Sequence, residues 1–164
     1  MDRLDGASLL AEAGVAHFQG AATLGALSEA AIRCLFEHGR ILALADGETL
    51  IRTGDTADAF FIVLEGQLAA YCKTADEDVP ILTLDFGEQI GYASMIALFP
   101  RPGEAQAHGA TVVLEVDTAL FYQLHEQLPF DFGVLMLNLS REMARGFLKV
   151  TAGLVCASAH HPVL

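Results

Sequence analysis

The sequence is poor in basic residues and contains no long apolar run. Nine Lys and Arg stand against 21 Asp and Glu, which gives a formal net charge of −12. An average field of this sign repels a polyanion such as DNA. The basic residues are also scattered, and they cluster only at Arg141, Arg145 and Lys149. We therefore expect no DNA partner for this chain acting alone.

Signals for membrane insertion and secretion are lacking as well. The apolar stretch around residues 135–139 is interrupted by Asn138, Arg141 and Glu142. No stretch reaches the roughly 18 apolar residues that a membrane span requires. The first five residues do not form a basic segment followed by an apolar one, so we expect no secretory signal. These features predict a cytoplasmic protein with no membrane partner.

Residues for metal binding and catalysis show no typical arrangement. Cys34, Cys72 and Cys156 form no CxxC pair and no iron–sulfur spacing, which favours reduced, buried thiols. The six histidines are scattered, whereas metal ligands must converge. Glycine-rich phosphate loops, the zinc-protease motif and the serine-hydrolase elbow are absent from the sequence. We predict no metal site, no catalytic residues and no enzyme activity.

The first 39 residues have a helical pattern. Residues 7–13 are rich in apolar side chains and predict a short helix. Ser28 is a suitable N-cap for a second helix over Glu29–His38, and Gly39 is a natural stop. We expect these helices to precede the main body of the fold.

Residues 40–125 predict a roll of short β-strands. Apolar runs alternate there with turn residues such as Asp46-Gly47, Gly54-Asp55 and Glu65-Gly66. Many short strands with regular turn signals favour a β-sandwich or barrel. The expected strands cover residues 41–45, 49–52, 59–64, 67–73, 81–84, 89–92, 111–116 and 119–124. The polar residues 74–78 predict a solvated hairpin tip.

From about residue 126 to residue 157 the pattern predicts one long helix. Its apolar seam consists of Met136, Leu139, Met143, Phe147, Val150 and Leu154. This spacing is typical of a helix that packs against another helix. One interpretation is a homodimer formed through this helix, and the other is a helix packed wholly on its own domain. We favour the homodimer, because a helix that is apolar on two flanks usually has two partners. The tail, residues 158–164, is expected to be disordered.

The stretch IRTGDTADAFFIVLEGQL at residues 51–68 resembles the cyclic-nucleotide-binding domain family, which includes regulators of the catabolite-activator and fumarate-nitrate types. Gly54 and Gly66 match the family's structural glycines, where positive φ or close packing is needed between twisted strands. The resemblance covers about residues 25–157. It implies a mainly β fold: an eight-stranded β-roll, related to the jelly roll, with N-terminal helices and a long C-terminal helix. No helix-turn-helix domain is expected after that helix.

The family binds its ligand through a phosphate-binding cassette, which the resemblance places within residues 87–111. The cassette has a Gly-Glu pair, a short helix and a Pro-Arg pair; backbone N–H groups and the Arg hold the cyclic phosphate. Gly87-Glu88 fits the preceding turn, and Gly91 fits the cassette glycine. Tyr92 then occupies the position of the ribose-binding Glu, without its charge. Ala93 and Ser94 complete the expected start of the ligand site.

Two residues compete for the position of the phosphate-binding Arg. Pro100-Arg101 copies the family's pair and follows Gly91 at a suitable distance. Reading back from a small-residue strand at 110–113, however, assigns His108 and implies an insertion in loop 99–109. In that case Arg101 is a solvated loop residue. The run at 105–107 resembles the oxygen- and redox-sensing branch, but the sequence supports neither its iron–sulfur cluster nor a haem bound by His108.

The resemblance predicts a stand-alone sensor domain that binds a small anionic ligand, with cAMP and cGMP as candidates. The expected ligand residues are Gly91, Tyr92, Ala93, Ser94, Arg101, His108 and Thr111. No cofactor is expected apart from a cyclic nucleotide. The alternative is a degenerate roll whose pocket is filled by Tyr92, Met95 and Phe99. Such a domain binds no nucleotide and acts as a dimerising interaction module.

Overall fold

The computed structural model describes residues 1–73 and 78–159. Its helices are α1 (Gly6–Ala13), α2 (Val15–Gln19), α3 (Glu29–His38), α4 (Tyr92–Ala97), α5 (Thr118–Gln127) and α6 (Pro129–Ala159). Its strands are β1 (Asp2–Leu4), β2 (Arg40–Leu44), β3 (Thr49–Ile51), β4 (Ala59–Glu65), β5 (Leu68–Lys73), β6 (Asp78–Leu84), β7 (Gln89–Ile90), β8 (Glu104–Ala107) and β9 (Thr111–Asp117). Most of the expected hairpin tip and of the expected disordered tail lies outside the described residues.

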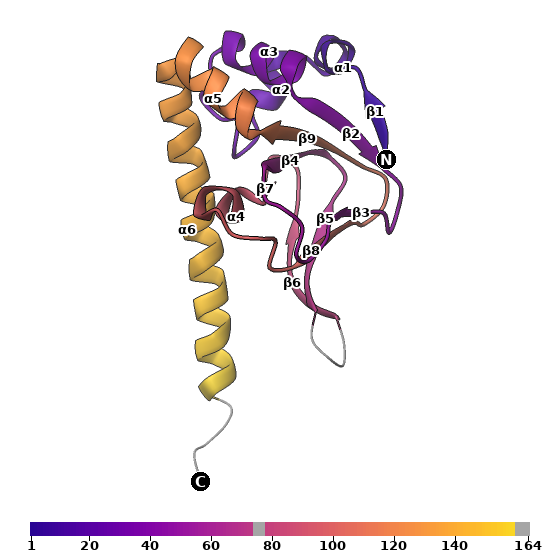
Figure 1. The fold of residues 1–164 in the computed structure, drawn as a ribbon, viewed down its shortest axis with the longest axis vertical. Helices are drawn as coiled ribbons and strands as arrows, with labels where there is room; N and C mark the ends of the chain where they lie inside the picture. The colour runs from indigo at the N-terminus through magenta and orange to yellow at the C-terminus, as the bar shows by residue number, and fades with distance from the viewer. Residues whose placement is uncertain (74–77, 160–164) are drawn as a thin grey trace.

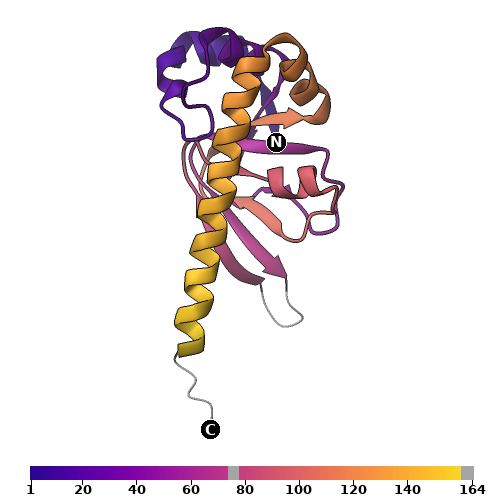
Figure 2. The same ribbon diagram turned by 90° about the vertical axis from the view of Figure 1, so that its left-hand side faces the viewer.

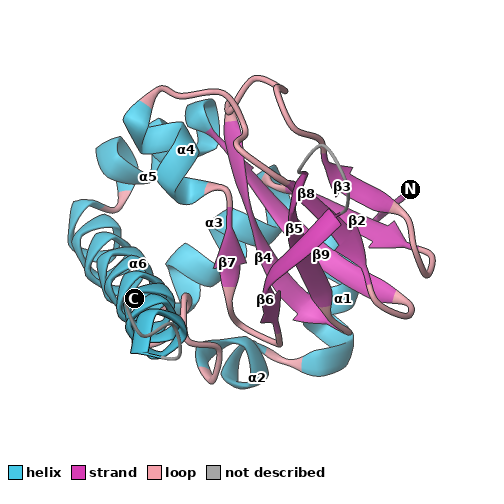
Figure 3. Ribbon diagram, turned by 90° about the horizontal axis from the view of Figure 1, so that it is seen from below, coloured by secondary structure: helices cyan, strands magenta, loops and turns pink. Residues whose placement is uncertain are grey.

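The strands form two antiparallel sheets that face each other as a roll (Figure 3). One sheet has the order β1-β2-β9-β4-β7, and the other has the order β3-β8-β5-β6. The N-terminal helices lie at one end of the roll, and α6 runs along its side (Figure 1). The predicted β-roll with flanking helices and a long C-terminal helix is confirmed, with nine strands among the described residues in place of eight.

Strand β4 separates two apolar cores, because successive side chains of a strand point to opposite faces. Phe61 and Val63 point into the roll and join an interior group that we call the roll cluster. Phe60 and Ile62 point outward and join helices α3, α5 and α6 in a second group, the helix-side cluster. All residues of β4 before Glu65 are buried, as expected for a strand covered on both faces.

Several predicted elements agree with the structure, and others are corrected by it. Helix α3 begins after Ser28, whose hydroxyl accepts from Ala31 N at 3.2 Å, as predicted. The expected strand at 119–124 is wrong: α5 occupies it, capped by Asp117, whose Oδ1 accepts from Leu120 N at 2.8 Å. Strands β1 and β8 and helix α2 were not predicted. The expected helix over 126–157 is divided, because α5 ends at Gln127 and α6 begins with Pro129.

The first half of α6 is tied to the N-terminal helices by buried polar side chains. The Asp131 carboxylate accepts from the backbone N (2.6 Å) and hydroxyl (2.9 Å) of Ser28. The Asn138 amide donates to the carbonyl oxygens of Thr23 (3.1 Å) and Gly25 (2.7 Å). Beyond this anchored part the helix continues past the end of the roll (Figure 2).

The cysteines only partly follow the prediction. Cys34 is buried and free, but Cys72 is free and exposed, which corrects the expectation of buried thiols. The side chain of Cys156 lies outside the described part. Within residues 1–73 and 78–159, no helix is both long and apolar enough to cross a membrane.

Candidate functional site

Arg101 lies inside the body of the protein and not on a solvated loop. Only 5% of its surface is exposed, so the loop alternative is wrong. Strand β8 follows it directly and pairs with β5 and β3. This strand of small residues starts three residues after Arg101, close to where the resemblance expects one. His108 lies beyond β8, and Arg101 stays the predicted phosphate-binding Arg.

The Gly54-Asp55 turn fixes the backbone of Arg101. The backbone N of Gly54 donates to the carbonyl oxygen of Arg101 at 2.8 Å. The backbone N of Arg101 donates to the carbonyl oxygen of Asp55 at 2.9 Å. Gly54 adopts a φ of +88°, which glycine tolerates without steric cost. The motif that carries the resemblance therefore positions the cassette arginine.

The guanidinium of Arg101 joins the cassette to β4 and faces the roll interior. Its Nη1 donates to the carbonyl oxygen of Gly91 at 2.8 Å, and its Nη2 donates to that of Ala59. Its central carbon lies 6.0 Å from the ring centroid of Phe61, a member of the roll cluster. A Cβ on Gly91 would lie 2.4 Å from Nη1, so a glycine is needed there.

The positive charge of Arg101 has no carboxylate in ion-pair contact among the described residues. Burial lowers the pKa of Arg101, while the charges on Asp58, Asp55 and Glu115 raise it. Glu115 is itself paired with Arg40. A guanidinium stays protonated in proteins. Its hydrogen bonds to the carbonyl oxygens of Gly91 and Ala59 leave further N–H donors for an anion. The site is thus a buried cation whose nearest carboxylates do not touch it.

Strand β6 carries two exposed apolar side chains, Ile81 and Leu82, which we call the apolar wall. Leu82 pairs with Ala70 of the roll cluster, so the two side chains share the interior face of the sheet. Leu82 is nevertheless 39% exposed, and the neighbouring Ile81 is 48% exposed. A Cβ on Gly103, two residues after Arg101, would lie 4.0 Å from Cδ1 of Ile81. Exposed apolar side chains of β6 thus lie close to the segment that follows Arg101.

Sequence comparison identifies the fold's family. A family model described as the cyclic nucleotide-binding domain matches residues 41–128. The chain belongs to the cyclic nucleotide-binding domain family. This membership supports a regulatory, sensing role for the domain.

Solved structures show the same fold. The cyclic nucleotide-binding domain from Methylobacillus flagellatus KT superposes with a TM-score of 0.81 at 20% identity, covering 95% of this chain and 88% of that one. The catabolite activator protein of Thermus thermophilus gives 0.70 at 19% identity, covering 84% and 63%. The c-di-GMP responsive regulator CLP of Xanthomonas campestris gives 0.69 at 16%, covering 76% and 62%. The chain thus spans less than two thirds of the two regulators.

Tyr92 does not lie with Arg101 in this cyclic nucleotide-binding domain. Its ring is 1% exposed and packs edge-on against Phe60 (5.6 Å between centroids) and Phe121 (6.1 Å). Its hydroxyl donates to Sδ of Met136 at 3.3 Å, and burial raises the pKa of Tyr92. Phe60 and Phe61 point to opposite faces of β4. Tyr92 therefore belongs to the helix-side cluster, on the face of β4 opposite to Phe61, and its expected contact with a ligand stays a prediction.

His108 and Thr111 also lie apart from Arg101. His108 is exposed, and its backbone N donates to the carbonyl oxygen of Gln67 at 2.9 Å. Thr111 is buried, and its hydroxyl donates to the same carbonyl at 2.9 Å. Both bonds stabilise the turn between β8 and β9, and β8 lies between this turn and Arg101 in the chain. Their assignment to the ligand site stays a prediction.

The remaining cassette residues lie on or beside α4. Ala93 is exposed and Ser94 is half-buried, and both stay predicted ligand residues. Met95 is buried with Tyr92 in the helix-side cluster, whereas Phe99 is 63% exposed. The three residues expected to fill a degenerate pocket therefore do not fill the roll, since two pack on its outer side and one faces solvent.

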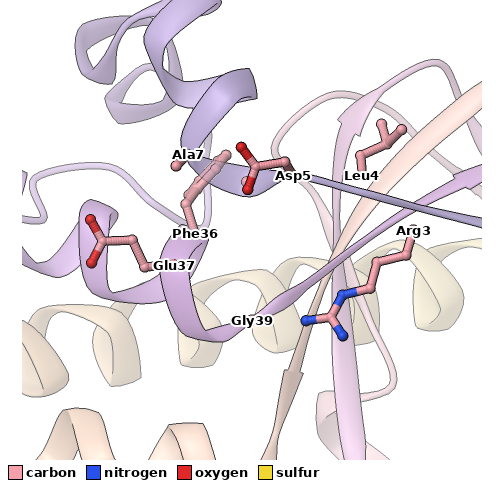
Figure 4. A pocket seen from close by; sticks show the side chains of 8 residues that line it. Arg3, Leu4, Asp5, Ala7, Phe36, Glu37 and Gly39 are labelled. Carbon is pink, nitrogen blue, oxygen red and sulfur yellow. The ribbon is translucent and has the colours of Figure 1, made fainter.

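Two surface cavities lie away from the cassette. One of about 410 Å³ lies where β1 and α1 meet the end of α3, and its walls include Arg3, Asp5 and Glu37 (Figure 4). Asp5 is engaged there as the cap of α1, bonded to Ser8 N at 2.9 Å. A second cavity of about 280 Å³ lies between His17 and the end of β4. Neither cavity was predictable from the sequence, because each is formed by segments distant in the chain.

Proposed function

We propose that this domain is a non-catalytic sensor that binds a small anion at Arg101, with cAMP and cGMP as the first candidates. The observation that carries the proposal is that Arg101 is only 5% exposed and that no carboxylate of the described residues contacts it. A buried charge is costly unless a partner compensates it. The phosphate of a ligand supplies that partner through charge-assisted hydrogen bonds.

The apolar wall supports an amphipathic ligand. A bare inorganic anion makes no use of the exposed surfaces of Ile81 and Leu82. A nucleotide places its phosphate on Arg101 and its base against an apolar wall. The absence of a side chain at Gly91 allows the guanidinium to approach its carbonyl closely, so the cassette holds the cation in place.

A second role, dimerisation, is favoured by a separate observation on α6. Phe147 is 69% exposed, Leu148 is 64% exposed and Val150 is 45% exposed. Large apolar side chains exposed close together are typical of an interaction site. We propose that a second copy of the chain covers it, in a cytoplasmic protein that acts without DNA or a membrane as partner. If no nucleotide binds, this surface favours the interaction-module alternative.

Calorimetric titration with cAMP and cGMP tests the sensor proposal. We expect saturable heat and a rise in melting temperature for the unmodified protein. Arg101→Gln should weaken binding on the order of 10- to 100-fold, because it removes charge-assisted hydrogen bonds. The matched control is Arg33→Gln, which alters an exposed arginine on α3. Absence of both heat and a melting-temperature rise at millimolar nucleotide would contradict a cyclic nucleotide ligand.

A further inference from the structure

Four side chains form a row across one sheet of the roll, and the row ends beside the cassette. Arg40 of β2 lies opposite Glu115 of β9. Glu115 and Ile90 of β7 both lie opposite Phe61 of β4, one on each side of that strand. Side chains of directly opposed residues project from the same face of a sheet. Because Phe61 belongs to the roll cluster and Ile90 packs against it, the row faces the interior of the roll.

Glu115 supplies a buried carboxylate to this row. The residue is 6% exposed, and its Oε1 accepts a hydrogen bond from Nη2 of Arg40. Its Oε2 accepts from none of the described residues. Among these residues the one fully buried polar side-chain atom without a partner is Oγ1 of Thr23, so Oε2 is within reach of solvent. Because a carboxylate accepts several hydrogen bonds, a molecule that enters the roll can donate one to Oε2.

Glu115 and Arg101 both approach the side chain of Phe61. The central carbon of the Arg101 guanidinium lies 6.0 Å from the centroid of the Phe61 ring, and Glu115 is the cross-strand partner of Phe61. Burial lowers the pKa of Arg101, and the charge of Glu115 is among those that raise it, which agrees with this proximity. The two groups nevertheless form no ion pair with each other. A cation and a carboxylate placed in this way suit a molecule that carries both an anionic group and a hydrogen-bond donor.

We propose that Glu115 is a specificity-determining residue of the Arg101 site, whose Oε2 accepts a hydrogen bond from a hydroxyl group of the ligand. Arg40 already balances the charge of Glu115, so a neutral hydroxyl fits this carboxylate better than a second cation does. The inference rests on the proposed binding of an anion at Arg101, and it narrows the ligand to hydroxylated organic phosphates. The acceptor comes from β9, because Tyr92 packs in the helix-side cluster.

Paired titrations with cAMP and 2′-deoxy-cAMP test this role. The 2′-hydroxyl is the one free hydroxyl group on the sugar of a 3′,5′-cyclic nucleotide, so the two probes differ only in the proposed donor. The unmodified protein should bind cAMP on the order of 10- to 100-fold more tightly, because a hydrogen bond to a charged acceptor is lost with the deoxy compound. In Glu115→Leu the two affinities should agree within about threefold, since Leu offers no acceptor. The affinity for 2′-deoxy-cAMP should change little.

The matched control breaks the same ion pair from its other side. Arg40→Gln removes the charge that faces Glu115 but leaves the carboxylate in place, and the Arg40 side chain is 55% exposed. The preference for cAMP over 2′-deoxy-cAMP should therefore persist in this variant. If Glu115→Leu fails to fold, Glu115→Gln takes its place, because it keeps the shape of the side chain. A neutral amide oxygen accepts a weaker bond than a carboxylate, so the preference should then fall at least threefold.

Several outcomes would overturn the role of Glu115. Equal affinities of the unmodified protein for the two nucleotides would do so while leaving the anion site at Arg101 intact. A preference for cAMP that persists in full without the Glu115 carboxylate would do so as well. Loss of the preference in Arg40→Gln, or loss of both nucleotides in the Glu115 variants, would assign Glu115 a structural role only. Failure of the unmodified protein to bind either nucleotide would overturn the cyclic-nucleotide proposal itself, so the two failures are distinguishable.

Discussion

The two halves of α6 carry the same apolar spacing but differ in what covers them. In the first half, Leu135 and Leu139 are fully buried against their own domain. In the second half, Phe147 and Leu148 are mostly exposed. The first half also has the polar anchors Asp131 and Asn138. The periodicity of apolar residues therefore defines which face of α6 is apolar. It does not show which part of that face its own domain covers, and the covered part is the one that carries the polar anchors.

Leu139→Ala should give the largest effect, because it opens a cavity in the helix-side cluster. We expect the free energy of unfolding to fall by about 2–5 kcal/mol. The matched control is Leu137→Ala, since Leu137 is 57% exposed and lies two residues away. That change should stay within about 0.5 kcal/mol. Urea denaturation measures both, and equal losses would remove the distinction between the two faces of α6.

Phe147→Glu tests the exposed half of α6. Burying an apolar side chain of this size contributes about 1.5–3 kcal/mol, so its loss should raise the dimer dissociation constant on the order of 10- to 100-fold. Light scattering should show a shift from dimer to monomer. Lys149→Glu, off the seam, introduces the same side chain with a larger change in net charge and should leave the mass unchanged. A monomeric unmodified protein would contradict the proposed dimer.

Asp131→Ala breaks the polar anchor of the first half. It leaves the Ser28 N–H and hydroxyl without their partner, which should cost about 1–3 kcal/mol in unfolding free energy. Ser28→Ala completes a double-mutant cycle, in which the combined loss should be less than the sum. Additive losses measured by urea denaturation would show that the two side chains act separately.

Tyr92 gives the smallest effect, visible only at alkaline pH. Burial raises its pKa above the ordinary value of 10.0, so the folded protein holds the phenol proton more tightly than the unfolded chain does. Stability should therefore fall as pH rises from that ordinary value toward the raised pKa. In Tyr71→Phe/Tyr122→Phe protein, tyrosinate absorbance should develop only above pH 10. Ionisation of Tyr92 at or below pH 10 would contradict its burial.

Much of the fold was predictable from local signals. The structure confirms Ser28 as the N-cap of α3 and Gly54-Asp55 as a turn before β4, both of which the sequence predicts. The helix at 119–124 was not predictable from its apolar residues, because a short apolar run fits the periodicity of a helix and that of a strand equally well. Asp117 as its N-cap was the available signal. Strand β8 was missed because alanine is uncommon in strands.

The candidate site was predictable in part. Gly91 and Arg101 follow from motif and spacing, and the structure brings them into contact. The burial of Arg101 was not predictable, because Pro102-Gly103 after it reads as an exposed loop. Nor does the sequence show to which side of the cassette Tyr92 points. That direction depends on Phe60, Phe121 and Met136, which come from three elements distant in the chain.

The most direct test of the account is the side-chain NMR signal of Arg101 during addition of cAMP. The Nε–H resonance is assigned by its loss in Arg101→Lys. If the buried guanidinium is the anion-binding group, this resonance should shift in a saturable manner, together with the phosphorus signal of the nucleotide. A resonance that stays unchanged up to millimolar cAMP, in folded protein, would contradict the assignment of Arg101 as a cyclic-phosphate ligand.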